Sequence, residues 1–172
     1  PHDVLVLTEV KLTPDKHAAA RIALRSIGYI SVSIGSNKGY AGILIASRLS
    51  EVPVDVRGLA GAAPTDDARF LVVDFLDPPM FICGIYAPFN NPEVENRSEE
   101  LNQFYKLLLP MMEHLLKKAK QTKSTLILAG DLQVAPTSLD QTPNADPTGP
   151  GSTGIERQYY NQLLDLGRFD TY

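Results

Sequence analysis

The sequence is poor in several features, and each shortage excludes a class of protein. A single cysteine, Cys83, allows no disulfide within the chain, and three histidines with one cysteine form no zinc-type ligand pattern. No apolar run approaches the roughly 18 residues of a transmembrane helix, so we expect no membrane partner. Acidic residues outnumber basic ones by 20 to 16, which argues against a protein that coats nucleic acids through a general positive charge.

The remaining composition is that of a folded globular chain. Hydrophobic residues make up 44% and charged residues 21% of the 172 positions, a length that suggests one domain. Cys83 lies inside the apolar run 80–85, where we expect it to pack as a small hydrophobic side chain. One unpaired cysteine favours an intracellular, reducing compartment.

Apolar runs and helical spacings alternate along the chain, a pattern typical of a layered α/β domain. The predicted strands are 3–7, 29–34, 43–46, 52–56, 70–75, 81–86 and 124–129, and the predicted helices are 14–27, 101–119 and 155–166. Thr13 is the expected cap of the first helix. Pro110 is expected to kink or break the long helix, and 136–154, rich in Pro, Gly, Thr and Asp, should be a long loop.

Two carboxylates occupy equivalent places in this pattern. Glu9 and Asp131 each follow a fully apolar predicted strand by one or two residues. Ligands of layered α/β folds gather at the carboxyl ends of strands, and two carboxylates brought together there would suit a hard ion such as Mg²⁺. The alternative is that each acid ends its strand simply because it faces water. No Walker loop, nucleophile elbow or dinucleotide fingerprint accompanies them.

Six short blocks along the chain resemble, in order, the signatures of the endonuclease/exonuclease/phosphatase superfamily. The closest resemblance is to exonuclease III-like apurinic/apyrimidinic endonucleases and to the endonuclease domains of non-LTR retrotransposons. In that family the blocks read L-Q-E-x-K, K-x-G-Y-S-G, E-G-R, Y-x-P-N, G-D-x-N-V-A and E-R. Their counterparts here are Asp3–Lys11, Lys38–Gly42, Asp67–Arg69, Ile85–Pro88, Ala129–Ala135 and Gly154–Arg157.

The resemblance implies a fold, a reaction and roles for three residues. The fold would be a two-sheet, four-layer α/β sandwich of the DNase I type, incomplete in this chain, and the reaction a DNA phosphodiester hydrolysis that uses Mg²⁺ or Mn²⁺. Glu9 would bind the metal, Asp131 would orient or deprotonate the attacking water, and Tyr86 would direct its phenol at the phosphate. DNA would then be the partner, in keeping with a nuclear location.

Other matched positions imply supporting roles or depart from the family pattern. Lys11 and Arg69 would assist a phosphate or brace the carboxylates, and a packing role for Arg69 is an equal alternative. Gln133 replaces the family's Asn on a stem one methylene longer. Phe89 stands where the family has another Asn, and Asn90 could substitute only if the turn is remodelled.

The family also has a preceding strand with a metal-site Asn and a closing Ser-Asp-His motif, neither of which occurs in residues 1–172. We therefore expect one partial domain over these residues, with low activity on its own. Its open sheet edges would accept a second copy or a completing segment of a longer polypeptide. Two alternatives stay open: a non-catalytic remnant that binds or dimerises, and a phosphatase acting on a small phosphate ester.

Overall fold

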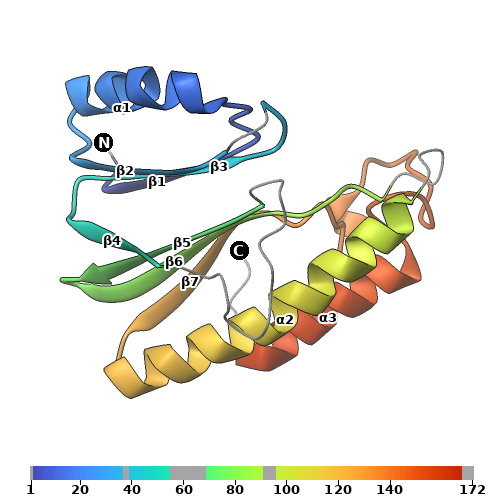
Figure 1. Cartoon of the computed structure of the whole chain (residues 1–172). Helices are drawn as coiled ribbons and strands as arrows, with labels where there is room; N and C mark the ends of the chain where they lie inside the picture. Colours follow the sequence, from blue (N-terminus) through green and yellow to red (C-terminus); the bar gives the residue numbers. More distant parts are fainter. Residues whose placement is uncertain (1, 37–38, 55–68, 91–95, 168–172) are drawn as a thin grey trace.

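The computed structural model describes residues 2–36, 39–54, 69–90 and 96–167. Two β-sheets face each other in the middle of the molecule, with helix α1 outside one sheet and helices α2 and α3 outside the other (Figure 1). This arrangement gives four layers in the order α/β/β/α, as the sequence predicts.

The first sheet contains three antiparallel strands, β1 (Val4–Thr8), β2 (Ser31–Gly35) and β3 (Ile43–Ser47), in the order β1-β3-β2. All five residues of β3 are buried, which explains why its sequence shows no polar alternation. Outside the sheet lie a short 3-10 turn, Pro14–Lys16, and α1 (His17–Ser26). Thr13 is the N-cap residue of this turn, as predicted, but its side chain makes no capping hydrogen bond.

The second sheet contains β4 (Glu51–Val54), β5 (Phe70–Leu76), β6 (Pro79–Tyr86) and β7 (Thr125–Asp131), in that order. Residues 55 and 56 of the predicted fourth strand lie outside the described residues. Strands β6 and β7 run parallel because α2 (Arg97–Thr122) crosses over between them. Helix α3 (Gly154–Gly167) packs beside α2 on the same face, and the predicted loop before it contains one 3-10 turn, Ser138–Asp140.

Helix α2 continues through Pro110, so the predicted break is wrong. Proline lacks the N–H that would bond one turn back and costs about 3 kcal/mol within a helix. The apolar face of α2 offsets this cost, because it is buried on both sides of Pro110. Its buried side chains are Leu101, Phe104, Tyr105, Leu108, Met111, Met112, Leu115 and Ala119.

Glu51 joins the two sheets through a hydrogen bond from the Ser33 hydroxyl to its Oε1, 2.6 Å long. Its other oxygen, Oε2, is buried without a partner in the described part of the chain, and burial raises the pKa of this carboxyl above 4.5. A raised folded-state pKa stabilises the fold fully below pH 4.5, and this contribution is lost as pH rises through the folded-state value.

We therefore expect Glu51→Gln to lose less stability than the parent between pH 4.5 and neutrality. Urea unfolding at a series of pH values measures this slope. Glu113→Gln, which removes the same charge from an exposed position on α2, is the control. An unchanged slope in Glu51→Gln would contradict the expectation.

Cys83 is fully buried in the core beside α2, and burial raises the pKa of its thiol to about 12. The side chain is therefore a neutral, packed group, as predicted. None of the helices described here is both long and apolar enough to span a bilayer.

Candidate functional site

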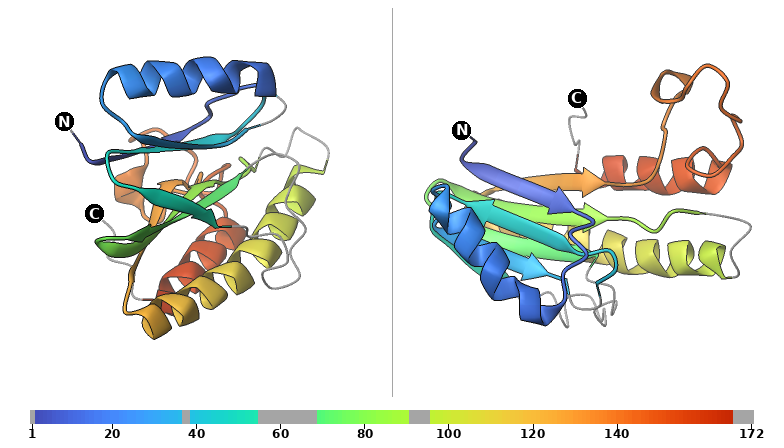
Figure 2. Two further views of the ribbon diagram at one scale, coloured as in Figure 1. Left: turned by 60° about the vertical axis from the view of Figure 1, so that its left-hand side comes forward. Right: turned by 90° about the horizontal axis from the view of Figure 1, so that it is seen from above.

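The ends of three strands define the site. In the parallel pair β6–β7, Tyr86 lies in register with Asp131, the last residue of each strand. Strand β1 of the other sheet lies against both strands and ends on the same side of the molecule (Figure 2). Glu9, one residue beyond β1, therefore emerges at this edge, near Tyr86.

The segment after β1 adopts an unusual backbone. Glu9 and Lys11 have φ values of 53° and 49°, in the left-handed region that residues with a side chain seldom occupy. Two backbone hydrogen bonds hold this segment to the turn between β2 and β3: Val10 N–H to the Gly42 carbonyl at 3.3 Å and Lys11 N–H to the Ala41 carbonyl at 2.9 Å. Strained residues that the surroundings fix in this way cluster at functional sites.

The turn that holds this segment requires glycine at position 42. Gly42 has φ 95°, and a Cβ there would lie 2.4 Å from the Ser36 hydroxyl oxygen. That hydroxyl accepts from the Leu12 N–H and donates to the Leu12 carbonyl, so Ser36 also holds the residue that follows Lys11. The turn between β2 and β3 thus supports the segment that carries Glu9.

Glu9 is paired with two neighbours. Its Oε2 lies 2.9 Å from the Lys11 ammonium nitrogen, and the Tyr86 phenol is close enough to lower the pKa of its carboxylate. Lys11 is the main cause that lowers the pKa of Glu9, and Tyr86 and Arg69 act in the same direction. Burial, and then the charge of Glu9, raise the pKa of Tyr86, so its phenol remains a proton donor at neutral pH.

We expect Lys11→Met to raise the pKa of Glu9 toward its ordinary value of 4.5, because the variant loses both the hydrogen bond and the positive charge. The carboxylate would then protonate at a higher pH. An NMR titration of the Glu9 side-chain carboxyl carbon measures the change. Lys16→Met on the neighbouring exposed turn is the control, and an unaltered Glu9 titration in Lys11→Met would contradict the expectation.

Asp131 is held by Gln133. The backbone N–H of Gln133 donates to Asp131 Oδ1 at 2.8 Å, and the Gln133 side-chain amide donates to Oδ2. Gln133 itself has φ 54°, which folds its side chain back onto the carboxylate. The longer stem of glutamine therefore still provides an amide donor to this aspartate.

Arg69 lies behind the site and is 3% exposed. Its guanidinium carbon is 5.0 Å from the centre of the Tyr86 ring and 5.5 Å from the centre of the Tyr40 ring. One guanidinium nitrogen, Nη1, donates a hydrogen bond to the Tyr86 carbonyl at 3.2 Å. A second nitrogen donates to the Tyr40 hydroxyl at 3.3 Å. Through these contacts Arg69 packs against Tyr86 and supports its position. A contact between Arg69 and a phosphate stays a prediction.

The structure does not bring Asn90 into the contacts described above. Asn90 is 7% exposed and accepts a hydrogen bond from the Ser98 hydroxyl at the start of α2, while the neighbouring Phe89 ring is exposed. A role for Asn90 at the phosphate stays a prediction. Lys38, Asp67 and Ala68 of the matched blocks lie outside the described residues.

Two residues that no chemical argument from sequence singled out are linked to Gln133 through the loop 134–153. Glu156 is buried and bonded to Gly151 and Thr153, and Arg157 donates to the Ala135 carbonyl. The only sequence signal for this pair was its match to the short E-R block.

The side chains at this site can be compared with the ligands that a divalent metal ion needs. The described ranges contain no group of three or more His, Cys, Asp or Glu side chains that could enclose a metal. Mg²⁺ keeps several of its waters and needs only one or two carboxylates, whereas zinc requires about four protein or substrate ligands. Glu9, an exposed carboxylate ionised at neutral pH, fits Mg²⁺ or Mn²⁺ in this manner.

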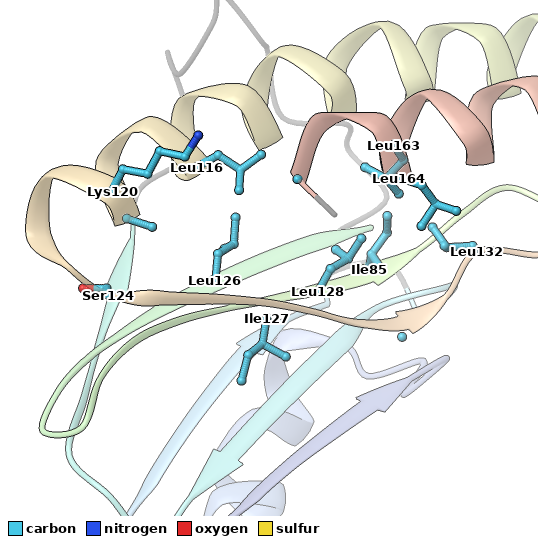
Figure 3. Close-up of a pocket in the computed structure, with 13 residues that line it drawn as sticks. Ile85, Leu116, Lys120, Ser124, Leu126, Ile127, Leu128, Leu132, Leu163 and Leu164 are labelled. Carbon is cyan, nitrogen blue, oxygen red and sulfur yellow. The ribbon is translucent and has the colours of Figure 1, made fainter. Parts of the chain in front are cut away.

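A cavity of about 440 Å³ lies away from these polar groups, between β7 and helices α2 and α3 (Figure 3). Its lining is mainly leucine and isoleucine, with Lys120 at one end. In the described part of the sheet β7 pairs only with β6, so its other edge is open. The expectation that a second copy or a completing segment covers such an edge stays a prediction.

Comparisons with solved structures agree on one fold. A 3′-5′ exonuclease from Neisseria meningitidis matches with a TM-score of 0.80 and 27% identity, over 97% of this chain and 62% of its own. An AP endonuclease from Archaeoglobus fulgidus matches with a TM-score of 0.71 and 27% identity, over 96% of this chain and 60% of its own.

A structure described as a 3′ phosphatase from Neisseria bound to a product DNA hairpin gives a TM-score of 0.79 and 27% identity, over 97% of this chain and 62% of its own. The chain thus spans about three fifths of the length of these proteins. No protein-family model matches the sequence, and neither does any curated protein. The chain thus shares the two-sheet sandwich of these structures, which belong to the DNase I-like endonuclease/exonuclease/phosphatase superfamily.

Proposed function

We propose that this chain carries the catalytic face of a metal-dependent nuclease that hydrolyses phosphodiester bonds in DNA. The observation that supports the proposal most is the junction of the two sheets, where the charge of Glu9 acts on the Tyr86 phenol and Tyr86 lies in register with Asp131. A 3′-5′ exonuclease, an AP endonuclease and a 3′ phosphatase bound to a product DNA hairpin are among the similar structures, which supports DNA as the substrate.

Asp131 acts as the general base in this proposal. Its carboxylate takes a proton from a water whose oxygen attacks phosphorus, and the scissile P–O bond breaks as the new P–O bond forms. Gln133 donates two hydrogen bonds to the same carboxylate and so fixes its orientation. The leaving oxygen receives its proton from solvent.

Tyr86 stabilises the charge that develops on the phosphate. A protonated phenol can donate to a non-bridging oxygen, and Arg69 holds the ring from behind. Glu9 would hold Mg²⁺ or Mn²⁺, because its carboxylate is exposed and its pKa is lowered. The bound ion would supply a positive charge for the phosphate oxygens.

The test is a cleavage assay of residues 1–172 on three substrates: duplex DNA with an abasic site, duplex DNA with a 3′-phosphate, and a phosphorylated inositol. We expect slow, Mg²⁺-dependent turnover of the DNA substrates, abolished by a chelator and by Asp131→Ala. Turnover of the inositol phosphate in preference to DNA would instead indicate a small-ester phosphatase. Cleavage that survives Asp131→Ala would refute the assigned site.

A second candidate, a non-catalytic DNA-binding module, is favoured by one observation. Both carboxylates already have partners within the chain, Lys11 for Glu9 and Gln133 for Asp131. A remnant of this kind would bind duplex DNA without cutting it. Its binding would be insensitive to Glu9→Ala and to Asp131→Ala, as measured by fluorescence anisotropy at fixed salt.

A further inference from the structure

Glu156 is a buried carboxylate whose hydrogen bonds all come from one segment. It is 2% exposed and accepts from the Gly151 N–H at 3.0 Å, from the Thr153 N–H at 3.0 Å and from the Thr153 hydroxyl at 2.6 Å. The bond from the Thr153 N–H belongs to the capping box of α3, in which Thr153 precedes the helix, Glu156 is its third residue, and the Glu156 N–H donates in return to the Thr153 hydroxyl at 3.4 Å. The bond to Gly151 exceeds what capping the helix requires.

Gly151, held by Glu156, is in turn hydrogen bonded to the segment that follows β7. Its carbonyl accepts from the Ala135 N–H at 2.6 Å, while the Ala135 carbonyl accepts from the Arg157 Nε–H at 3.1 Å. Both backbone polar groups of Ala135 are thus held by this end of α3 and the turn before it. Gly151 has φ 82°, and a Cβ there would lie 3.5 Å from the Gln133 carbonyl oxygen, so the two segments lie close together.

Ala135 lies two residues from Gln133, the residue that orients Asp131. Gln133 keeps a left-handed backbone only if the chain on both sides of it is fixed. On one side β7 fixes the chain, since the Asp131 carbonyl accepts from the Ala87 N–H at 2.8 Å. On the other side the two hydrogen bonds of Ala135 hold the chain two residues beyond Gln133.

We propose that Glu156 and Arg157 are positioning residues that hold the Gln133 amide on the Asp131 carboxylate. This inference rests on the proposed function for its catalytic consequence, but not for its structural one. Neither side chain needs to touch the substrate. They affect the reaction by keeping Asp131 in its orientation. Displacement of a catalytic group by about 1 Å can cost on the order of 10²-fold in rate.

The experiment compares Arg157→Ala, Arg157→Lys and Glu156→Gln with two matched controls. Arg21→Ala removes a guanidinium that donates to the Val32 carbonyl at 3.3 Å on the opposite side of the molecule, and Asp165→Asn removes an exposed charge from α3 itself. In each protein the side-chain amide resonances of Gln133 and the hydrogen exchange of the Ala135 amide are measured by NMR. Cleavage of abasic DNA gives kcat and KM separately.

We expect the Arg157 and Glu156 variants to shift the Gln133 amide resonances and to speed exchange at Ala135, whereas the controls do neither. We also expect kcat to fall about 10- to 100-fold with KM within about twofold of the parent, and Arg157→Lys to keep more activity than Arg157→Ala. Unchanged Gln133 resonances in folded Arg157→Ala would overturn the inference. Should Glu156→Gln or Arg157→Ala not fold, Arg157→Lys decides the matter.

The two readouts separate this inference from the proposed function. If the parent protein does not cleave DNA, the proposed function fails, and the NMR measurements alone decide whether Glu156 and Arg157 hold Gln133. If the parent cleaves and Gln133 does not respond to either variant, the nuclease assignment stands and the positioning role is wrong.

Discussion

Replacement of Asp131 by asparagine is expected to lower the rate of DNA cleavage by about 10² to 10⁴-fold, the contribution of a positioned general base. Asparagine has the same shape but accepts no proton at neutral pH. Its NH₂ group would also face the two donors of Gln133, which now bond to both carboxylate oxygens. The fold should be kept, because Asp131 lies at the end of β7 and is only half-buried.

Single-turnover cleavage at saturating Mg²⁺ measures this rate, and fluorescence anisotropy checks that DNA binding is retained. Asp165→Asn, the same chemical change on an exposed part of α3, is the control. Glu9→Gln provides a further contrast, because a weakened metal ligand should be compensated by more Mg²⁺, whereas a missing base should not. Equal cleavage rates for Asp131→Asn and the parent would remove Asp131 from the mechanism.

The sequence predicts the frame of the site because the frame depends on buried strands. Runs such as Ile43–Ser47 are apolar at nearly every position because both of their faces are covered, and this pattern is visible without a structure. The residue that follows such a run is placed at the edge of the sheet. Glu9 and Asp131 were therefore identifiable as strand-end acids, and the ordered blocks of the family added Tyr86.

The conformation of the loops could not be predicted in the same way, because partners distant in the sequence determine it. Glu9 and Lys11 are held in the left-handed region by Ala41 and Gly42, about 30 positions further on. Arg69 fits between Tyr86 at the end of β6 and Tyr40 in the turn between β2 and β3, and Arg157 reaches Ala135 across 22 positions. No local propensity encodes such contacts. The uninterrupted α2 has a related cause, since tertiary burial of its apolar face outweighs the local cost of Pro110.

Gly130→Ala is expected to be the most destabilising single substitution near the site, with a loss of about 3 to 5 kcal/mol in the free energy of unfolding. Gly130 has φ 142°, a conformation that costs an alanine energy before any contact is made. A Cβ built there would lie 1.9 Å from the Ile85 carbonyl oxygen and 2.9 Å from its carbonyl carbon, well inside contact distance. Both atoms belong to the backbone of β6, so no side-chain rotation can relieve the clash.

The damage should reach the site directly, because Ile85 and Gly130 are the register pair just before Tyr86 and Asp131. Pushing β6 and β7 apart at that point would separate the phenol from the carboxylate. Urea unfolding measures the stability loss, with Gly154→Ala as the matched control, since a Cβ at Gly154 meets nothing within 4 Å. Unfolding of Gly130→Ala within about 1 kcal/mol of the parent would show that β6 and β7 are less closely apposed than described. It would also weaken the link between strand register and catalytic geometry on which the site depends.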